Sequence, residues 1–134
     1  ETRMSACRNL AAHPRIAVSG VEAEIQTRYT YDTLRFLCAR CPGVRFVWIM
    51  GADNLLHFHR WRHWREIAQL VPMAVIDRPG ATLNSGGSVS AQFFSRSRIL
   101  EKDAGLLATM RPPALVYLHG RRTSQSSTAL RATL

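Results

Sequence analysis

Apolar residues along the chain follow two alternating patterns, short continuous runs and helical spacing. Residues 44–50, 73–76 and 114–118 are nearly continuous in apolar and β-favouring residues, which is typical of strands covered on both faces of a parallel sheet. Between the first two runs, helical spacing predicts a helix over residues 61–70. The alternation of strands and helices predicts an α/β sheet.

The first twenty residues predict a helix followed by a strand. Met4, Cys7 and Leu10 recur at helical spacing before Pro14, which indicates an amphipathic helix within residues 1–13. Residues 15–19, Arg-Ile-Ala-Val-Ser, have the pattern of a short strand.

A further helix is predicted to begin near residue 30. Thr30 or Asp32 can supply a side-chain oxygen to the free N–H groups at its start. Pro42 and Gly43 would stop it. Its apolar face, turned toward the core, would comprise Leu34, Leu37, Cys38 and Cys41.

The chain has 3 cysteines, an odd number that fits a reducing compartment better than a disulfide-stapled secreted domain. Cys38 and Cys41, with His57 and His59 further on, are residue types that bind zinc. The compact second ligand pair of a zinc finger is missing from the sequence. We therefore interpret both cysteines as reduced core residues and predict no metal ion held by protein ligands.

Residues 81–111 give the weakest pattern. Serine and glycine dominate residues 84–90, and charges of both signs are mixed in residues 96–103. Helical spacing returns only at residues 104–110. We expect a variable, irregular excursion here.

Composition narrows the picture in two ways. With 134 residues, of which 46% are hydrophobic, the chain can form the core of one domain, and we expect a single domain over residues 1–134. The net charge of +9 favours anionic partners such as nucleotides, nucleic acid or acidic lipid. The longest apolar run, residues 46–52, is too short to cross a bilayer, so we expect a cytoplasmic protein.

Polar residues that directly follow predicted strands are the first candidates for a site, because open α/β sheets bind ligands beyond the carboxyl ends of their strands. Gly51 and Asp53 follow the first buried run. Glycine lets a ligand approach the backbone closely, and aspartate accepts hydrogen bonds from sugar hydroxyls. The same residues also suit a plain strand-to-helix turn.

A second candidate follows the last predicted strand. Ser126, Ser127 and Thr128 would offer hydroxyls and unpaired N–H groups at a helix start, with Arg131 one turn further on. Such a group can bind a polyphosphate. It is equally consistent with capping hydroxyls and a solvated arginine.

A third candidate is the basic and aromatic segment at residues 58–65, Phe-His-Arg-Trp-Arg-His-Trp-Arg. Its rings can stack on a planar ligand, and its charges attract phosphate. The segment also suits an RNA-binding strip, and Trp61 and Trp64 can equally be core residues on one helical face.

Taken together and in order, segments of the chain resemble the bacterial nicotinate-nucleotide adenylyltransferases, nucleotidyltransferases with a Rossmann-like sheet. These segments are Arg3-Met4, Val18-Ser19 with Glu22, Tyr29-Thr30-x-x-Thr33-Leu34, Trp48-Ile49-Met50-Gly51-Ala52-Asp53, Phe58-x-x-Trp61, Arg78-Pro79-Gly80 and Ser126-Ser127-Thr128-x-x-Arg131. The resemblance covers nearly the whole chain and is weakest over residues 81–111. It implies a single nucleotidyltransferase domain with a parallel sheet and helices on both faces.

The resemblance also implies roles for the matching residues. Tyr29 and Thr30 would hold the nicotinate end through their backbone, and Trp61 would stack on the pyridine ring. Gly51 and Asp53 would line the nucleotide crevice. The residues facing the ATP phosphates would be Arg78, Ser126, Ser127, Thr128 and Arg131, with Thr128 and Arg131 as catalytic residues.

The implied reaction transfers AMP from ATP to nicotinate mononucleotide, giving nicotinate adenine dinucleotide and pyrophosphate in NAD biosynthesis. A phosphate monoester is largely ionised near neutrality, so the reaction needs no protein general base. Mg²⁺ bound with ATP, arginines and helix N-termini would stabilise the phosphate charge. The partners would be ATP and nicotinate mononucleotide, without nucleic acid, and a homo-oligomer stays open.

One motif of the family is missing. The family opens with a strand and a turn of the form G-x-F-x-P-x-H-x-G-H, whose histidines contact the reacting phosphates, and residues 1–25 contain no match. The family's last helix also continues beyond the position of Leu134. We therefore expect a chain that is incomplete at both ends. Two alternatives are a basic, aromatic nucleic-acid-binding module and a catalytically inactive fragment of the adenylyltransferase.

Overall fold

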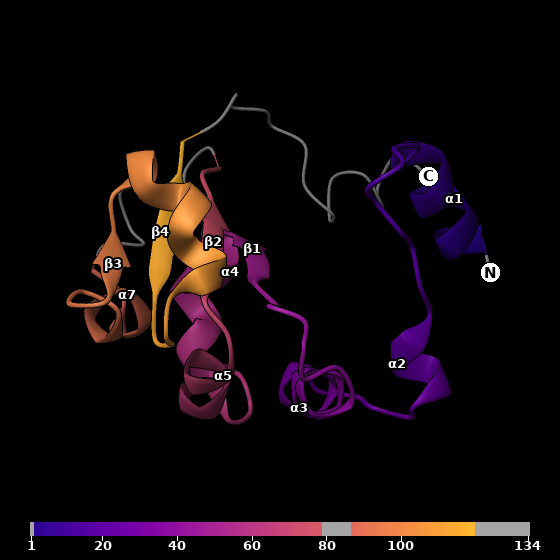
Figure 1. Ribbon diagram of the computed structural model, residues 1–134, viewed down its shortest axis with the longest axis horizontal. Coiled ribbons are helices and arrows are strands. Elements are labelled where there is room, and N and C mark those ends of the chain that lie inside the picture. The colour runs from indigo at the N-terminus through magenta and orange to yellow at the C-terminus, as the bar shows by residue number, and fades with distance from the viewer. Residues whose placement is uncertain (1, 79–86, 120–134) are drawn as a thin grey trace.

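The computed structural model describes residues 2–78 and 87–119, which contain a 4-stranded parallel sheet (Figure 1). The strands are β1 (Trp48–Gly51), β2 (Met73–Ile76), β3 (Arg98–Ile99) and β4 (Leu115–Leu118). They lie in the order β1-β2-β4-β3, and every neighbouring pair is parallel. Parallel neighbours need crossover connections, and each connection between successive strands contains at least one helix. The predicted α/β fold is confirmed.

The helices of the described residues are short. They are α1 (Thr2–Leu10), α2 (Val21–Glu24), α3 (Thr30–Arg40), α4 (Ala52–His57), η1 (Phe58–Arg60), α5 (Trp64–Leu70), α7 (Val89–Phe93) and η2 (Glu101–Thr109), where η denotes a 3₁₀ helix. None of these helices is both long and apolar enough to cross a membrane.

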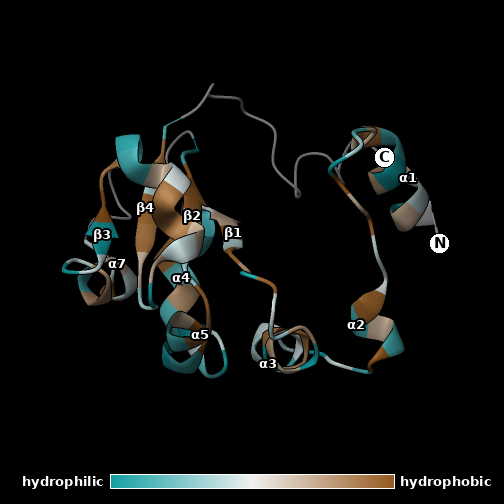
Figure 2. Ribbon diagram, in the orientation of Figure 1, coloured by the Kyte–Doolittle hydropathy of each residue, from teal (hydrophilic) through white to brown (hydrophobic). Residues whose placement is uncertain are grey.

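Helices cover both faces of the sheet, and the apolar side chains that alternate along β2 and β4 are buried beneath them. On one face, Met73 and Val75 of β2 are buried against α3, α4 and α5. On the other face, Ala74 of β2 and Val116 of β4 are buried against Leu107 of η2. Figure 2 shows β2 and β4 as apolar strands, as expected for strands that are covered on both sides.

The N-terminal segment differs from the sequence prediction. The helix is present as α1, but its apolar face is uncovered, with Leu10 79% exposed and Cys7 exposed. Residues 15–19 form no strand, and Ile16 is 55% exposed. The prediction of a strand was wrong because an apolar pattern alone supplies no pairing partner, and in Figure 1 α1 and α2 lie apart from the sheet.

Helix α3 has part of the predicted apolar face, because Leu37 and Cys41 are not among the core residues, and it lacks the predicted cap. Leu34 is buried, and Cys38 packs against the core. The N-cap residue is Tyr29, in an extended conformation, and no side chain caps the helix. Thr30 and Asp32 already lie inside the first turn, so the prediction that either one caps the helix was wrong.

Two predicted elements are shorter than the pattern suggested. The strand predicted over residues 44–50 begins only at Trp48, because Val44 lies outside the sheet and is 54% exposed. The helix predicted over residues 61–70 begins at Trp64. His63 before it has φ 56°, a left-handed conformation that cannot continue an α-helix from the preceding residues.

Residues 87–111 are more regular than expected. They form α7, β3 and η2, and Ser88 caps α7 by accepting a hydrogen bond from the Ala91 N–H at 3.0 Å. The helix predicted over residues 104–110 is the end of η2, which is 3₁₀ and not α. The pattern was hard to read because β3 has only 2 residues and a 3₁₀ helix lacks the 3.6-residue period.

Candidate active site

The carboxyl ends of three strands lie level with one another. Gly51 of β1 is paired in register with Ile76 of β2, which is paired with Leu118 of β4. The residues that follow these strands therefore share one edge of the sheet. This edge is where ligands of open α/β sheets bind.

At this edge, an ion pair lies directly over Gly51. Arg78 Nε is 3.4 Å from Asp53 Oδ1, and both side chains are partly exposed. A Cβ atom on Gly51 would lie 2.5 Å from Asp53 Oδ1 and closer still to Arg78 Nε. Gly51 has an ordinary φ of −75°, which any residue can adopt. Glycine is needed here because a side chain would collide with the ion pair. Three residues predicted to line the ATP crevice are thus in contact.

Trp61 lies in the turn between η1 and α5, where aromatic neighbours hold its ring. Its ring centroid is 5.2 Å from that of Phe58, in an edge-on arrangement. Trp48 of β1 also meets it edge-on, at 6.0 Å. Phe58 is fully buried, so Trp61 is anchored to the core while remaining partly exposed. Trp64 makes its own contacts with Phe58 at 6.0 Å, so both tryptophans pack on the core.

A cavity of about 250 Å³ lies beside Trp61. Its lining residues are Arg28, Tyr29, Thr30, Arg60, Trp61, Arg62 and Ile67. The structure thus brings together Tyr29, Thr30 and Trp61, the residues predicted to hold the mononucleotide. The guanidinium of Arg62 lies 4.9 Å from the centre of the Tyr29 ring, which places a positive charge at the aromatic wall. The cavity suits a flat ligand that carries negative charge.

Arg28 is the lining residue that sequence reasoning missed. No spacing rule links it to the basic segment that contains Arg60 and Arg62. The sequence signal was only its position directly before Tyr29.

The second candidate site, the group of residues predicted to bind the ATP phosphates, lies outside the described residues. This holds for all of its members: Ser126, Ser127, Thr128 and Arg131. Their contact with ATP stays a prediction.

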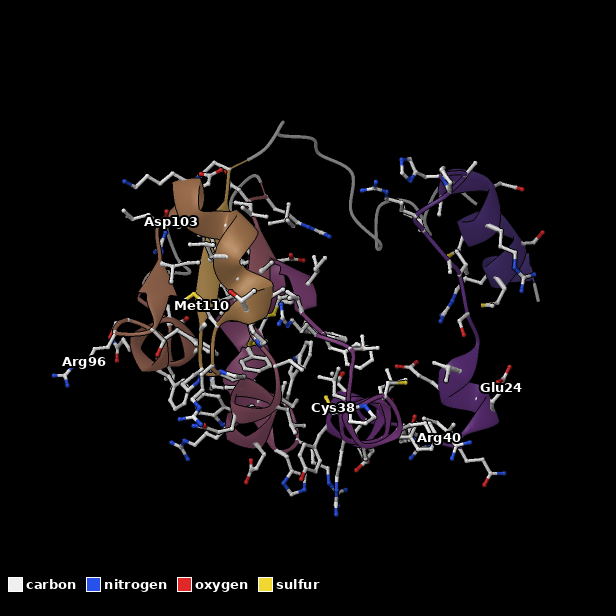
Figure 3. All side chains as sticks on the ribbon, viewed as in Figure 1. Glu24, Cys38, Arg40, Arg96, Asp103 and Met110 are labelled. Carbon is white, nitrogen blue, oxygen red and sulfur yellow. The ribbon has the colours of Figure 1, made fainter. Side chains whose placement is uncertain are left out.

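The cysteines are free thiols with different surroundings. Cys7 is exposed, whereas Cys38 is partly buried on α3 (Figure 3). Burial, with a smaller contribution from the nearby Cys41, raises the pKa of the Cys38 thiol. Within residues 2–78 and 87–119, no group of three or more His, Cys, Asp or Glu side chains could hold a metal ion.

Comparisons with known proteins identify the family. The family described as Cytidylyltransferase-like matches residues 1–133. The chain is 53% identical to a probable nicotinate-nucleotide adenylyltransferase of Agrobacterium fabrum, over 98% of this chain and 70% of that protein. It is 55% identical to a probable enzyme of the same name from Methylorubrum extorquens, over 98% of this chain and 71% of the relative. The chain therefore belongs to the nicotinate-nucleotide adenylyltransferases, within the cytidylyltransferase-like family.

Proposed function

We propose that the protein transfers AMP from ATP to nicotinate mononucleotide, as a step of NAD biosynthesis. The observation that carries this proposal is the cavity in which Tyr29, Thr30 and Trp61 meet. These residues come from two segments of the chain, and the family resemblance assigns all three to one ligand.

The cavity offers each part of nicotinate mononucleotide a matching group. The indole face of Trp61 can stack on the pyridine ring, and such stacking is worth about 1–3 kcal/mol per ring. The first N–H groups of α3, starting at Thr30, have no acceptor within the helix and can receive the nicotinate carboxylate. Arg28, Arg60 and Arg62 supply positive charge for the phosphate.

The reaction needs alignment more than proton transfer. An oxygen of the mononucleotide phosphate attacks the α-phosphorus of ATP, and the bond from that phosphorus to the pyrophosphate oxygen breaks. The attacking phosphate is already largely ionised near neutrality, because its second pKa is about 6. The protein must therefore hold two anions together and stabilise the charge on the leaving pyrophosphate. We assign this stabilisation to Arg78, Thr128 and Arg131, with Ser126 and Ser127.

Mg²⁺ would enter with ATP. Asp53 is paired with Arg78 at 3.4 Å, and a carboxylate in such a pair is less available to a metal ion. The phosphate oxygens of ATP would hold the ion, whose charge supports departure of pyrophosphate. We further propose that residues 1–134 belong to one nucleotidyltransferase domain, which acts in the cytoplasm.

Trp61→Ala tests the assignment, with Trp64→Ala as a matched control that also removes an aromatic ring packed on Phe58. We expect Trp61→Ala to lower the affinity for nicotinate mononucleotide about tenfold or more. The affinity for ATP should change less than about twofold. Trp64→Ala should lower the melting temperature without this selectivity. Calorimetric binding and pyrophosphate release measure both effects, and equal losses for the two ligands from Trp61→Ala would contradict the assignment.

The wild-type protein separates the alternative functions. Dinucleotide formation supports the enzyme. Binding of both nucleotides without turnover would instead identify an inactive fragment. Binding of single-stranded RNA in preference to either nucleotide would favour the nucleic-acid module.

A further inference from the structure

His119 is the first residue after β4, on the sheet edge that carries the proposed ATP residues. Leu118, which precedes it, is level in register with Ile76 of β2. The backbone N–H of Asp77 continues this ladder by donating to the Leu118 carbonyl at 2.9 Å. His119 therefore lies beside Asp77, the residue that precedes Arg78 in the chain, although no motif pointed to it as a site residue.

One carboxylate holds His119 at two points. Glu101, the first residue of η2, accepts a hydrogen bond from the His119 backbone N–H at 2.9 Å through Oε1. Its other oxygen, Oε2, lies 3.0 Å from the ring nitrogen Nδ1 of the same histidine. Because both oxygens contact a single residue, the carboxylate fixes the orientation of the imidazole as well as its position.

A buried tyrosine restrains the same ring from another direction. The ring centroid of Tyr117 lies 5.0 Å from that of His119. Tyr117 is only 5% exposed, and its hydroxyl lies 3.5 Å from Asp77 Oδ1. The imidazole is thus held between a fixed aromatic neighbour and a fixed carboxylate.

This arrangement leaves Nε2 as the outward nitrogen. Glu101 engages Nδ1, and no residue within 2–78 or 87–119 makes a hydrogen bond to Nε2. The side chain is 53% exposed, so a ligand at the sheet edge can reach it. An exposed ion pair of this kind contributes little to the stability of a fold, so stability alone does not explain why the ring is held at two points. Orientation of Nε2 toward a ligand accounts for the geometry better.

We propose that His119 is a further ligand of the polyphosphate of ATP and that Glu101 is its positioning residue; this inference rests on the proposed function. When protonated, the ring donates from Nε2 to a phosphate oxygen while Nδ1–H stays bonded to Glu101. The hydrogen bond is charge-assisted and adds to the positive charge that Arg78 brings to the same edge.

Two substitutions at His119 separate ligand binding from a structural role. The amide nitrogen of asparagine can reach the position of Nδ1, so His119→Asn keeps the bond to Glu101 and removes the outward donor. The amide nitrogen of glutamine can reach the position of Nε2, so His119→Gln keeps the outward donor. We expect His119→Asn to lower the affinity for MgATP and for inorganic pyrophosphate about tenfold. The affinity for nicotinate mononucleotide should change less than about twofold. His119→Gln should lose less polyphosphate affinity than His119→Asn.

The positioning role of Glu101 has its own readout. Glu101→Gln should lower the affinity for pyrophosphate with the same ligand selectivity as His119→Asn but to a smaller degree. The Nε2 donor of His119 remains in this variant, and only its orientation is lost. The double variant that combines Glu101→Gln with His119→Asn should have the same Michaelis constant for ATP as His119→Asn alone. Additive losses would overturn the positioning role.

Calorimetric titration of the full chain, with a thermal melt of each variant, decides the proposal. Wild-type affinity for pyrophosphate in His119→Asn would overturn it. So would a loss for adenosine equal to the loss for ATP, which would place the contact at the nucleoside. If the wild type makes the dinucleotide while both His119 variants bind pyrophosphate normally, the inference fails and the proposed function stands. If the wild type makes no dinucleotide but His119→Asn still loses pyrophosphate, the proposed function fails and the polyphosphate subsite stands.

Discussion

The substitution Gly51→Ala tests the geometry of the sheet edge directly. The added methyl group would lie 2.5 Å from Asp53 Oδ1 and even closer to Arg78 Nε, well inside van der Waals contact. The backbone itself can accept alanine, since φ is −75°. Both clashing atoms belong to flexible side chains, so the strain can be relieved by separating Asp53 from Arg78.

The stability of the fold should therefore change little. Replacing glycine by alanine at a compatible backbone position stabilises by about 0.4–1 kcal/mol through the unfolded chain. Separating a partly exposed ion pair costs about 0.2–1 kcal/mol. These terms nearly cancel, so the melting temperature of Gly51→Ala should stay within about 4 °C of the wild type.

ATP binding should respond much more strongly. If Arg78 contacts the ATP phosphates as proposed, displacing its guanidinium removes a charged hydrogen bond worth about 1.5–3 kcal/mol, so ATP affinity should fall about tenfold or more. In an Arg78→Ala background the added methyl group has no guanidinium to displace. Gly51→Ala should then have almost no further effect, which a double-mutant cycle by calorimetry measures. Additive losses, or a melting temperature lowered by more than about 10 °C, would refute this reasoning.

Three further predictions concern packing and ionisation. Phe58→Ala should lower the free energy of unfolding in urea by about 3–5 kcal/mol, because the ring is fully buried; a loss below about 1 kcal/mol would contradict the packing. Cys38 should be alkylated more slowly than exposed Cys7 at about pH 8, because burial raises the pKa of its thiol; equal rates by peptide mass spectrometry would contradict this. The hydrogen bond with the His119 side chain holds the pKa of Glu101 below its ordinary value of 4.5, so the stabilisation by ionised Glu101 is present above that pH and is lost as the pH falls through the lower folded pKa. Glu101→Gln should therefore reduce the acid dependence of the melting temperature, and an unchanged dependence would contradict the contact.

The central strands could be predicted from sequence because they are covered on both faces. β2 coincides with the predicted residues 73–76, and β4 differs from its prediction by one residue. Residues 15–19 carry a similar pattern but form no strand. The difference lies in pairing, which depends on distant parts of the chain and leaves no local mark.

The candidate site could be predicted only in part. The family resemblance placed Tyr29 and Trp61 at one ligand, and the cavity unites them. It did not indicate that Trp61 lies in a turn, because the left-handed conformation of His63 depends on tertiary packing. The bond between Glu101 and His119 joins residues 18 positions apart on different elements, and no spacing rule relates them.

The strand pairing also has a consequence for how the chain folds. Trp48 pairs with Met73, 25 positions away, and Met73 pairs with Leu115, 42 positions further on. Neither neighbour of β2 can be recruited through a tight turn, so each pairing must first meet the entropic cost of closing a long loop. Sheets dominated by such distant pairings assemble more slowly than helical bundles of equal length, which gather their contacts locally. Until β2 is flanked on both sides, its apolar residues and its backbone hydrogen-bonding groups stay open to other chains, and this interval is when the protein is most prone to aggregate.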